Sequence, residues 1–281
     1  MITTSSPFAI KRYIALELRR LREEANFSQQ DVAEAIGITR GNVSHLEKMR
    51  HLPKQPELMA MLNLYGKSDL IETFVKLTKA ARRPTARIVS NIKDFELVIG
   101  YEQGSTAIEW FEALSVPGLL QTRDYARAVL QASAEQLTNK QVHEFVEQRV
   151  QRQAVLDKDD PPSLWVVLTE GVLRCNVGGR DVMRAQLARL IEDANRPGVQ
   201  LQVLPAAVGA HAAMQSPFTI FEFPTPASPR VAYTETSVMG HCYEEPEQVA
   251  TFTAVFNRLR VACLDPAHSL AFLDKLRKDS T

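Results

Sequence analysis

The sequence has few cysteines, no long apolar run and no overall excess of either charge. Its three cysteines, Cys175, Cys242 and Cys263, are widely spaced and odd in number, so neither a disulfide framework nor a CxxC zinc site is indicated. No stretch approaches the roughly 20 consecutive apolar residues that span a bilayer, and the first residues lack the apolar core of a signal peptide. We therefore expect a soluble, cytoplasmic protein with no membrane partner.

The charge balance is zero overall but uneven along the chain. The 33 basic residues equal the 33 acidic ones, which argues against a protein that attracts polyanions through its overall field. Residues 1–89, however, hold 15 Lys and Arg against 9 Asp and Glu, a net charge of +6, and residues 90–281 hold 18 against 24, a net charge of −6. A basic N-terminal third is thus joined to an acidic remainder.

The length of 281 residues is typical of two domains. We expect residues 1–82 to form an all-α bundle of five helices, residues 83–92 to be a linker, and residues 93–281 to form a mixed α/β domain. The arginine-containing run that ends at Arg87 is expected to be a solvated connection, with extra phosphate contacts as the alternative.

Short helices with clear start and stop signals are predicted in the N-terminal third. Apolar periodicity predicts helices over residues 10–25, 29–36, 40–49, 57–65 and 69–81. Ser28 stands three residues before Asp31, a capping-box pattern that begins the second helix. Gly37 supplies the left-handed residue that ends this helix, and Thr39 can N-cap the third helix. The second and third helices are therefore separated by a tight turn.

The residues around this turn meet the packing needs of a helix-turn-helix. Two short helices that cross at roughly 90–120° need a small residue at the contact, a turn residue tolerant of positive φ, and inward apolar anchors. Ala33, Gly37, Val43 and Leu46 fill these positions. The segment LRRLREEANFSQQDVAEAIGITRGNVSHLEKMRHLP resembles the Xre, or lambda-repressor/Cro-like, helix-turn-helix family, and the resemblance covers residues 13–75. It implies binding of double-stranded operator DNA.

The third predicted helix presents a polar outer face. With Val43 and Leu46 turned inward, helical spacing leaves the polar residues outward, with Asn42 at the flank. Arg40, in the first turn, is the best candidate for reading a base because arginine can donate two hydrogen bonds to guanine; a phosphate contact is the alternative. His45 either reaches a base edge or lies along the DNA backbone.

The remaining predicted DNA contacts position the protein rather than read sequence. The family resemblance assigns Gln29 to a phosphate clamp that braces the third helix. Gly41 has no side chain and so permits close approach of the backbone. The full set of predicted DNA-binding residues is Gln29, Thr39, Arg40, Gly41, Asn42, Ser44, His45, Lys48 and Arg50.

Beyond residue 90 the hydrophobic pattern changes to a mixture of periods. Apolar, β-branched runs predict strands over residues 164–169, 199–204, 218–223 and 231–236. Helical periodicity marks residues 121–132, 138–156, 181–194, 246–262 and 268–278. Residues 106–113 form either a further strand or a short helix. An α/β domain of about 190 residues has the size to bury its own core.

The acidic part also carries a distinctive motif, VPGLLQT, at residues 116–122. Together with YARA at 125–128, VGG at 177–179 and VLP at 203–205, it resembles the C-terminal domain of actinobacterial Xre regulators described as WhiJ-like or antitoxin-like. This resemblance extends over residues 90–278. It implies a DNA-binding regulator, often with a small partner protein encoded nearby.

Considered by its residues alone, VPGLLQT has the composition of a structural corner. Pro117 and Gly118 signal a turn, and the two leucines that follow can anchor it in the core. Thr122 can N-cap the helix that contains Tyr125. The alternative is a part in binding a ligand or a partner.

No known catalytic motif is present in the acidic part. The sequence has no P-loop, G-x-S-x-G elbow, H-E-x-x-H or G-x-G-x-x-G, so we expect no enzyme, no cofactor and no metal. Gly178 and Gly179 precede a predicted helix and indicate a tight turn, with an anion site as the weaker alternative. The separations of His211, His241, Cys242 and Cys263 match no common metal-ligand spacing.

Four further residues of this part have alternative interpretations. Glu170 and Glu235 each end a predicted strand and are either rim residues of a pocket or partner surface, or ordinary surface carboxylates. Trp110 and Trp165 are expected in the core rather than as cofactor-stacking residues.

Two functions follow from these observations. The leading one is a cytoplasmic, nucleoid-associated transcription regulator that binds operator DNA as a homodimer, because two modules spaced by ~34 Å combine their contacts on a pseudo-palindrome. The acidic domain would then mediate dimerisation and respond to a partner protein or a small-molecule effector. The alternative is an antitoxin-like protein that sequesters a small partner encoded nearby and binds DNA for autoregulation. In both functions, we expect the acidic domain to face partner molecules or the acidic domain of the second protomer rather than the DNA duplex.

Overall fold

A computed structural model describes residues 7–82, 95–133, 137–224, 230–236 and 240–279. Its contacts divide the chain into two compact units, the first built mainly from residues 1–87 and the second from residues 88–222 and 230–281. The predicted linker at residues 83–92 lies outside the described residues. Within the described ranges, no helix combines the length and the apolar character needed to cross a membrane.

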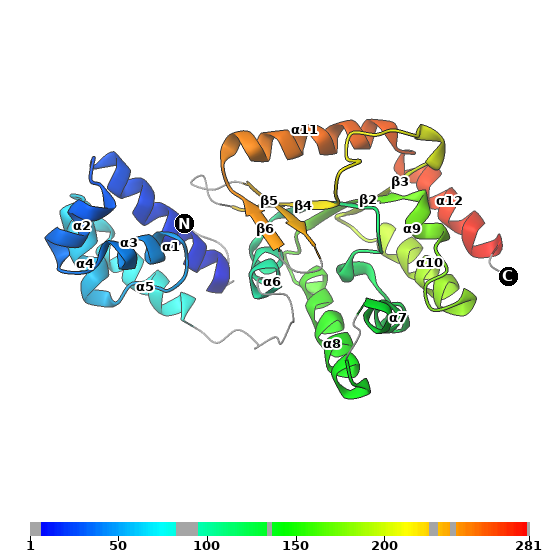
Figure 1. Cartoon of the computed structure of the whole chain (residues 1–281), viewed down its shortest axis with the longest axis horizontal. Helices are drawn as coiled ribbons and strands as arrows, with labels where there is room; N and C mark the ends of the chain where they lie inside the picture. Colours follow the sequence, from blue (N-terminus) through cyan, green and yellow to red (C-terminus); the bar gives the residue numbers. More distant parts are fainter. Residues whose placement is uncertain (1–6, 83–94, 134–136, 225–229, 237–239, 280–281) are drawn as a thin grey trace. The chain divides into compact units, whose positions relative to one another are not determined.

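The first unit is helical (Figure 1). Its described helices are α1 (Pro7–Glu24), α2 (Gln29–Ile36), α3 (Arg40–Glu47), α4 (Gln55–Leu64) and α5 (Ile71–Ala81), and a 3-10 turn, η1 (Ser68–Leu70), precedes α5. The predicted bundle of five helices is confirmed. Several helix bounds differ from the predicted ones by one to three residues. Helix α3, for example, ends at Glu47 rather than at residue 49, where Met49 takes a left-handed φ of 59°.

One core joins the five helices of the first unit. Leu18 of α1, Val32 of α2, Leu46 of α3, Leu62 of α4 and Phe74 of α5 are all buried in it. Helices α2 and α3 have 8 residues each, and helices of that length are marginal in isolation. Their stability therefore depends on this shared core.

The second unit contains one mixed sheet, with the order β3-β2-β1-β4-β5-β6 among the described strands. The strands are β1 (Ala107–Glu112), β2 (Ser163–Thr169), β3 (Val199–Leu204), β4 (Phe218–Glu222), β5 (Arg230–Glu235) and β6 (Gly240–Tyr243). Strands β1, β2 and β3 are parallel, whereas β4, β5 and β6 are joined in antiparallel pairs. The mixed α/β class is confirmed, and the segment 106–113 is a strand.

Helices cover both faces of the sheet. The described helices are α6 (Phe95–Gly104), α7 (Arg123–Ser133), α8 (Asn139–Arg152), α9 (Glu170–Arg174), α10 (Arg180–Ala194), α11 (Pro246–Ala262) and α12 (Pro266–Asp279), with 3-10 turns η2 (Gly118–Leu120), η3 (Gln153–Asp157) and η4 (Ala206–Val208). Helix α11 runs along one face, and α6, α8 and α10 lie on the other (Figure 1).

The two faces of the sheet differ in chemistry because successive side chains of a strand alternate. On the α11 side, Phe111 and Phe218 pack into an apolar cluster. On the opposite side, Trp110 and Tyr233 are both register partners of Thr219. This second face carries the polar and charged groups that are considered below.

Candidate nucleic-acid interface

The turn between α2 and α3 is fixed by caps on both helices. Ser28 Oγ accepts a hydrogen bond from the Asp31 N–H at 3.2 Å, and the Asp31 carboxylate accepts one from the Ser28 N–H at 2.7 Å. Gly37 has φ 72° and ends α2. Thr39 Oγ1 accepts from the Asn42 N–H at 3.1 Å and begins α3. The capping box, the left-handed glycine and the N-cap are all as predicted.

A buried ion pair fastens α3 to the rest of the unit. Arg22 Nε lies 2.6 Å from Glu47 Oε1, and Arg22 Nη1 donates to the Phe27 carbonyl at 2.8 Å. Gln29 Nε2 donates to Glu47 Oε2 at 2.8 Å. The hydrogen bond with Glu47 raises the pKa of Arg22. The Gln29 side chain thus joins α2 to α3, while its contact with phosphate stays a prediction.

The outer face of α3 is polar, and its inner face is buried. Val43 and Leu46 are turned inward, as the spacing predicts. The exposed members of the predicted set are Thr39, Arg40, Gly41, Asn42, Lys48 and Arg50, and the half-buried members are Gln29, Ser44 and His45. Within the described part of the chain, no hydrogen bond or ion pair holds the Arg40 guanidinium. This side chain is therefore able to reach out from the first turn of α3.

Three side chains meet at the end of α3, one of which the sequence reasoning missed. Arg50 Nη1 lies 3.0 Å from His45 Nε2, and the ring of His51 meets that of His45 edge-on, with centroids 6.0 Å apart. A guanidinium can only donate, so Arg50 is the donor in this contact with His45 Nε2. The basic run KMRHLPK was the signal for His51, which is exposed beside the predicted contacts.

In the second unit, three buried glutamines hold the VPGLLQT segment through its backbone. Gln121 Nε2 donates to the Val116 carbonyl at 2.6 Å. Gln153 Nε2 donates to the carbonyls of Gly118 and Gln121 at 2.9 and 2.8 Å. Gln186 bonds the backbone on both sides of Gln121, at 2.7 Å each. These side chains therefore satisfy backbone groups of the segment on either side of and within the short 3-10 turn η2.

The apolar residues of the same segment anchor it as predicted. Leu119 and Leu120 are fully buried. Thr122 Oγ1 accepts from the Tyr125 N–H at 3.3 Å, and the Tyr125 hydroxyl accepts from the Val116 N–H at 3.1 Å. The motif is a hydrogen-bonded corner at the start of α7.

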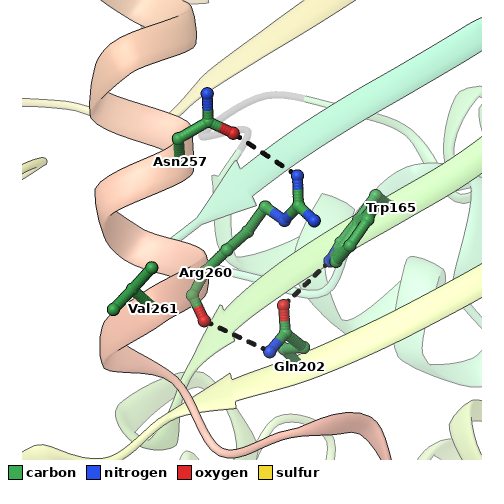
Figure 2. Close-up of a pocket in the computed structure, with 5 residues that line it drawn as sticks. All are labelled: Trp165, Gln202, Asn257, Arg260 and Val261. Carbon is green, nitrogen blue, oxygen red and sulfur yellow. Dashed lines mark hydrogen bonds between the residues drawn. The ribbon is translucent and has the colours of Figure 1, made fainter.

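A pocket of about 320 Å³ lies on the α11 side of the sheet. Its lining residues are Trp165, Gln202, Asn257, Arg260 and Val261 (Figure 2). The Arg260 guanidinium carbon lies 3.4 Å from the centre of the Trp165 ring, and Trp165 Nε1 donates to Gln202 Oε1 at 3.0 Å. Gln202 also donates to the Arg260 carbonyl (Figure 2). These groups satisfy one another, so packing accounts for the half-buried Trp165.

Other predicted positions of the second unit serve the fold. Glu170 accepts from the Ala206 N–H at 2.9 Å and from Arg174 Nε at 2.6 Å, and these bonds lower its pKa. Gly178 and Gly179 have φ 71° and 96° and form the turn before α10. No group of three or more His, Cys, Asp or Glu side chains in the described ranges is arranged to hold a metal ion.

Two family models match the chain. A model described as a helix-turn-helix domain matches residues 14–73, which extend from α1 to α5. A model described as a domain of unknown function, DUF5753, matches residues 95–275, which contain the sheet. No curated protein and no solved structure matches the chain.

Proposed function

The chain belongs to the DUF5753 family and carries a helix-turn-helix domain, and we propose that it is a transcription regulator that binds operator DNA as a homodimer. The observation that carries this proposal is the outer face of α3. It is polar, exposed and held by a capped turn and a buried ion pair. The net charge of +6 in residues 1–89 supplies attraction to phosphate.

The roles that we propose for the residues of α3 and of the segment directly after it follow from their positions and their chemistry. Arg40 reads a guanine from the first turn, where its guanidinium has no partner among the described residues, and such a pair discriminates against a wrong base by ~1–3 kcal/mol. Gly41 allows the helix to approach closely. Lys48 and Arg50 contact phosphate. The loss of one such contact should reduce, by about one, the slope of the logarithm of the binding constant against the logarithm of the salt concentration.

Genome-wide mapping of binding sites, followed by footprinting on a mapped operator, tests this assignment. Arg40→Ala should abolish selective protection while leaving weak, salt-sensitive binding. Lys79→Ala removes an equal charge from an exposed position on α5 and serves as the control. Selective protection that survives Arg40→Ala unaltered would refute the role of Arg40. Half-sites about 34 Å apart would support the dimer.

We assign dimerisation and the response to an effector to the second unit. It has a core of its own, and its net charge of −6 over residues 90–281 disfavours contact with the duplex. Cross-linking the full chain to a mapped operator tests this. Cross-links should come from the first unit, and cross-links from residues 95–279 to DNA bases would count against it.

Exposed apolar side chains in the second unit favour an antitoxin-like function as the second candidate. Leu114, after β1, and Met214, before β4, are 77% and 66% exposed, and apolar groups left in water often mark partner sites. Co-expression of the full chain with the product of the neighbouring gene discriminates. Stoichiometric capture that persists in Arg40→Ala supports sequestration, whereas no capture together with wide genomic occupancy supports the regulator.

A further inference from the structure

The pocket on the α11 side of the sheet has a fixed wall. It lies between the C-terminal end of α11 and strands β2 and β3 (Figure 2). Gln202 of β3 is only 5% exposed, and both ends of its amide are in use. The oxygen accepts from Trp165 Nε1, and the nitrogen donates to the carbonyls of Arg260 and Leu264 at 3.3 and 2.9 Å. The indole and the amide are therefore held in place by hydrogen bonds between the strands and the end of the helix.

Arg260 carries the only charge among the residues that line this pocket. Its guanidinium carbon lies 3.4 Å from the centre of the Trp165 ring, so the cation rests on the face of the indole. Its side chain is half-buried, and Nη1 donates to Asn257 Oδ1 at 3.4 Å, which is long for a hydrogen bond (Figure 2). Within the ranges that the structure describes, no carboxylate lies in ion-pair range of this guanidinium.

The other charges on this part of the sheet are already paired. Glu109 of β1 is the register partner of Trp165, and its carboxylate lies 3.3 Å from Arg230 Nη1. A carboxylate also lies in ion-pair range of each of three other half-buried arginines of the second unit, Arg189, Arg196 and Arg230. Taking a guanidinium partly out of water without a counter-ion is costly. Arg260 is thus a cation at a pocket for which the described residues provide no direct anion.

The stack on Trp165 prepares Arg260 to bind a carboxylate. A guanidinium has five donors in one plane, and Asn257 uses one of them. Because the indole face fixes this plane, the remaining donors at its edge can meet both oxygens of a carboxylate without further ordering. The pocket thereby offers a planar, preformed site for a single negative group.

The surroundings of the guanidinium favour a small ligand with an apolar body. Trp165 is half-buried and Val261 is 88% exposed, so both present apolar surface at the pocket. The volume of about 320 Å³ is near the lower end of the range for ligand sites, roughly 300–1,000 Å³. A ligand of one ring or one short chain fits this size.

We propose that this pocket binds a small monocarboxylic acid whose body is a single aromatic ring or a branched alkyl chain. The carboxylate binds the edge of the Arg260 guanidinium, and the apolar body lies against Trp165 and Val261. A second negative charge on the ligand would meet the repulsion of Glu109, and a neutral ligand would leave the guanidinium without an anion. The bound acid is the effector of the second unit, so this inference rests on the effector-sensing role proposed above.

Calorimetric titration of the full chain, without DNA, tests the site with benzoate, phenylacetate and 3-methylbutanoate. At least one of the three acids should bind at one site per chain with a dissociation constant below about 1 mM. Benzamide, which has the shape of benzoate without its charge, and inorganic phosphate, which has charge without an apolar body, should bind at least about tenfold more weakly. Absence of saturable binding by all three acids overturns the proposal, as does benzamide or phosphate binding as tightly as the best acid.

Variants of Arg260 locate the carboxylate. Arg260→Gln should weaken binding of the acid by at least about tenfold. Arg260→Lys keeps the charge but not the planar donors, and should give an intermediate loss. Arg258→Gln removes an equal charge from an exposed position of the same helix and should leave binding unchanged. Melting followed by far-ultraviolet circular dichroism confirms that each variant is folded.

A variant at an exposed position keeps the test decisive if Arg260→Gln does not fold. Val261→Asp places a carboxylate at the pocket without disturbing the core, and should weaken binding of the acid by at least about threefold through charge repulsion. Ala254→Asp, at an exposed position about two turns earlier on α11, is the matched control and should have little effect. If Arg260→Gln and Val261→Asp both bind the acid normally, the site is wrong.

The effector role has its own measurement. A saturating concentration of the bound acid should change the affinity for a labelled, mapped operator by at least about fivefold in fluorescence anisotropy. An unchanged affinity would refute the effector role. Because the titration contains no DNA and footprinting contains no carboxylic acid, failure of this site and failure of operator binding are separate results.

Discussion

The carboxylate of Glu47 in α3 binds the guanidinium of Arg22 in α1, with Nε and Nη2 at 2.6 and 3.1 Å from its two oxygens. The two side chains are only 3% and 9% exposed. Gln29 of α2 donates to the same carboxylate, so three helices meet at Glu47. The orientation of the eight-residue α3 depends on such contacts more than on helix propensity.

We expect Glu47→Ala to destabilise the first unit by about 3–5 kcal/mol, because it leaves a buried guanidinium without its partner. Both tryptophans, Trp110 and Trp165, belong to the second unit. Urea unfolding followed by tryptophan fluorescence therefore reports that unit, whereas far-ultraviolet circular dichroism reports both. We expect the variant to shift the part of the dichroism transition that comes from the first unit to lower urea concentration. The urea midpoint measured by tryptophan fluorescence should not change.

Glu34→Ala, at an exposed acid of α2 bonded to Gln30, is the matched control and should change neither transition appreciably. An unchanged dichroism transition in Glu47→Ala would mean that the ion pair contributes little to stability.

Gly41→Ala should separate stability from DNA binding. A Cβ at Gly41 would meet Thr39 Oγ1 at 3.7 Å, an ordinary contact, and alanine favours a helix interior by roughly 0.5–1 kcal/mol. The first unit should become more stable, yet the added methyl group on the outer face of α3 should weaken operator binding. Dichroism-monitored urea unfolding and fluorescence anisotropy with a labelled operator measure the two effects.

Gly66→Ala is the control for this variant. Gly66 has φ 69°, so alanine there should destabilise the unit without altering operator affinity while the protein is folded. Equal operator affinities for Gly41→Ala and the unsubstituted protein would place the DNA away from this face.

The elements predicted best are those that neighbouring residues specify. The capping box at Ser28, the left-handed Gly37 and the N-cap Thr39 are local signals, and each is found where it was predicted. The pair of Arg22 and Glu47 is separated by 25 positions and carries no local pattern, so it emerges only when α1 and α3 pack.

The parts that sequence reasoning missed depend on tertiary contacts. Strand β6, Gly240–Tyr243, has 4 residues and no alternation of apolar side chains, and it forms by pairing with β5. Arg152 of α8 and Glu102 of α6 form a buried ion pair at 3.0 Å, although they are far apart in the sequence. No local pattern indicates that these two side chains meet.

The pH dependence of the second unit should identify Glu102 as a buried acid. Burial raises the pKa of Glu102 to about 7, from an ordinary value of 4.5, although Arg152 opposes the shift. The native state then binds more protons than the unfolded state between these values, so stability falls as the pH rises through this range. A shift of this size corresponds to at most about 3 kcal/mol.

Glu102→Gln should make that fall shallower. The measurement is the free energy of unfolding at about pH 5, 6 and 7, from urea titrations followed by tryptophan fluorescence. Other acids with raised pKa, such as Glu109 and Glu112, stay in the variant, so the difference between the two slopes belongs to Glu102. Glu192→Gln, at an exposed acid of α10, should keep the original slope. An identical slope in Glu102→Gln would show that this carboxyl titrates normally.

Gly118→Ala tests why the corner motif contains glycine. A Cβ at Gly118 would overlap the guanidinium of Arg152, which cannot simply retreat because Glu102 holds its other side. We expect a loss of roughly 1–3 kcal/mol, as for overpacking elsewhere in protein cores, seen as a lower urea midpoint of tryptophan fluorescence. Gly171→Ala in α9, where a Cβ would meet Thr169 Oγ1 at an ordinary 3.8 Å, should be neutral or stabilising. If Gly118→Ala is equally neutral, Arg152 has room to move, and the glycine is needed for something other than packing against it.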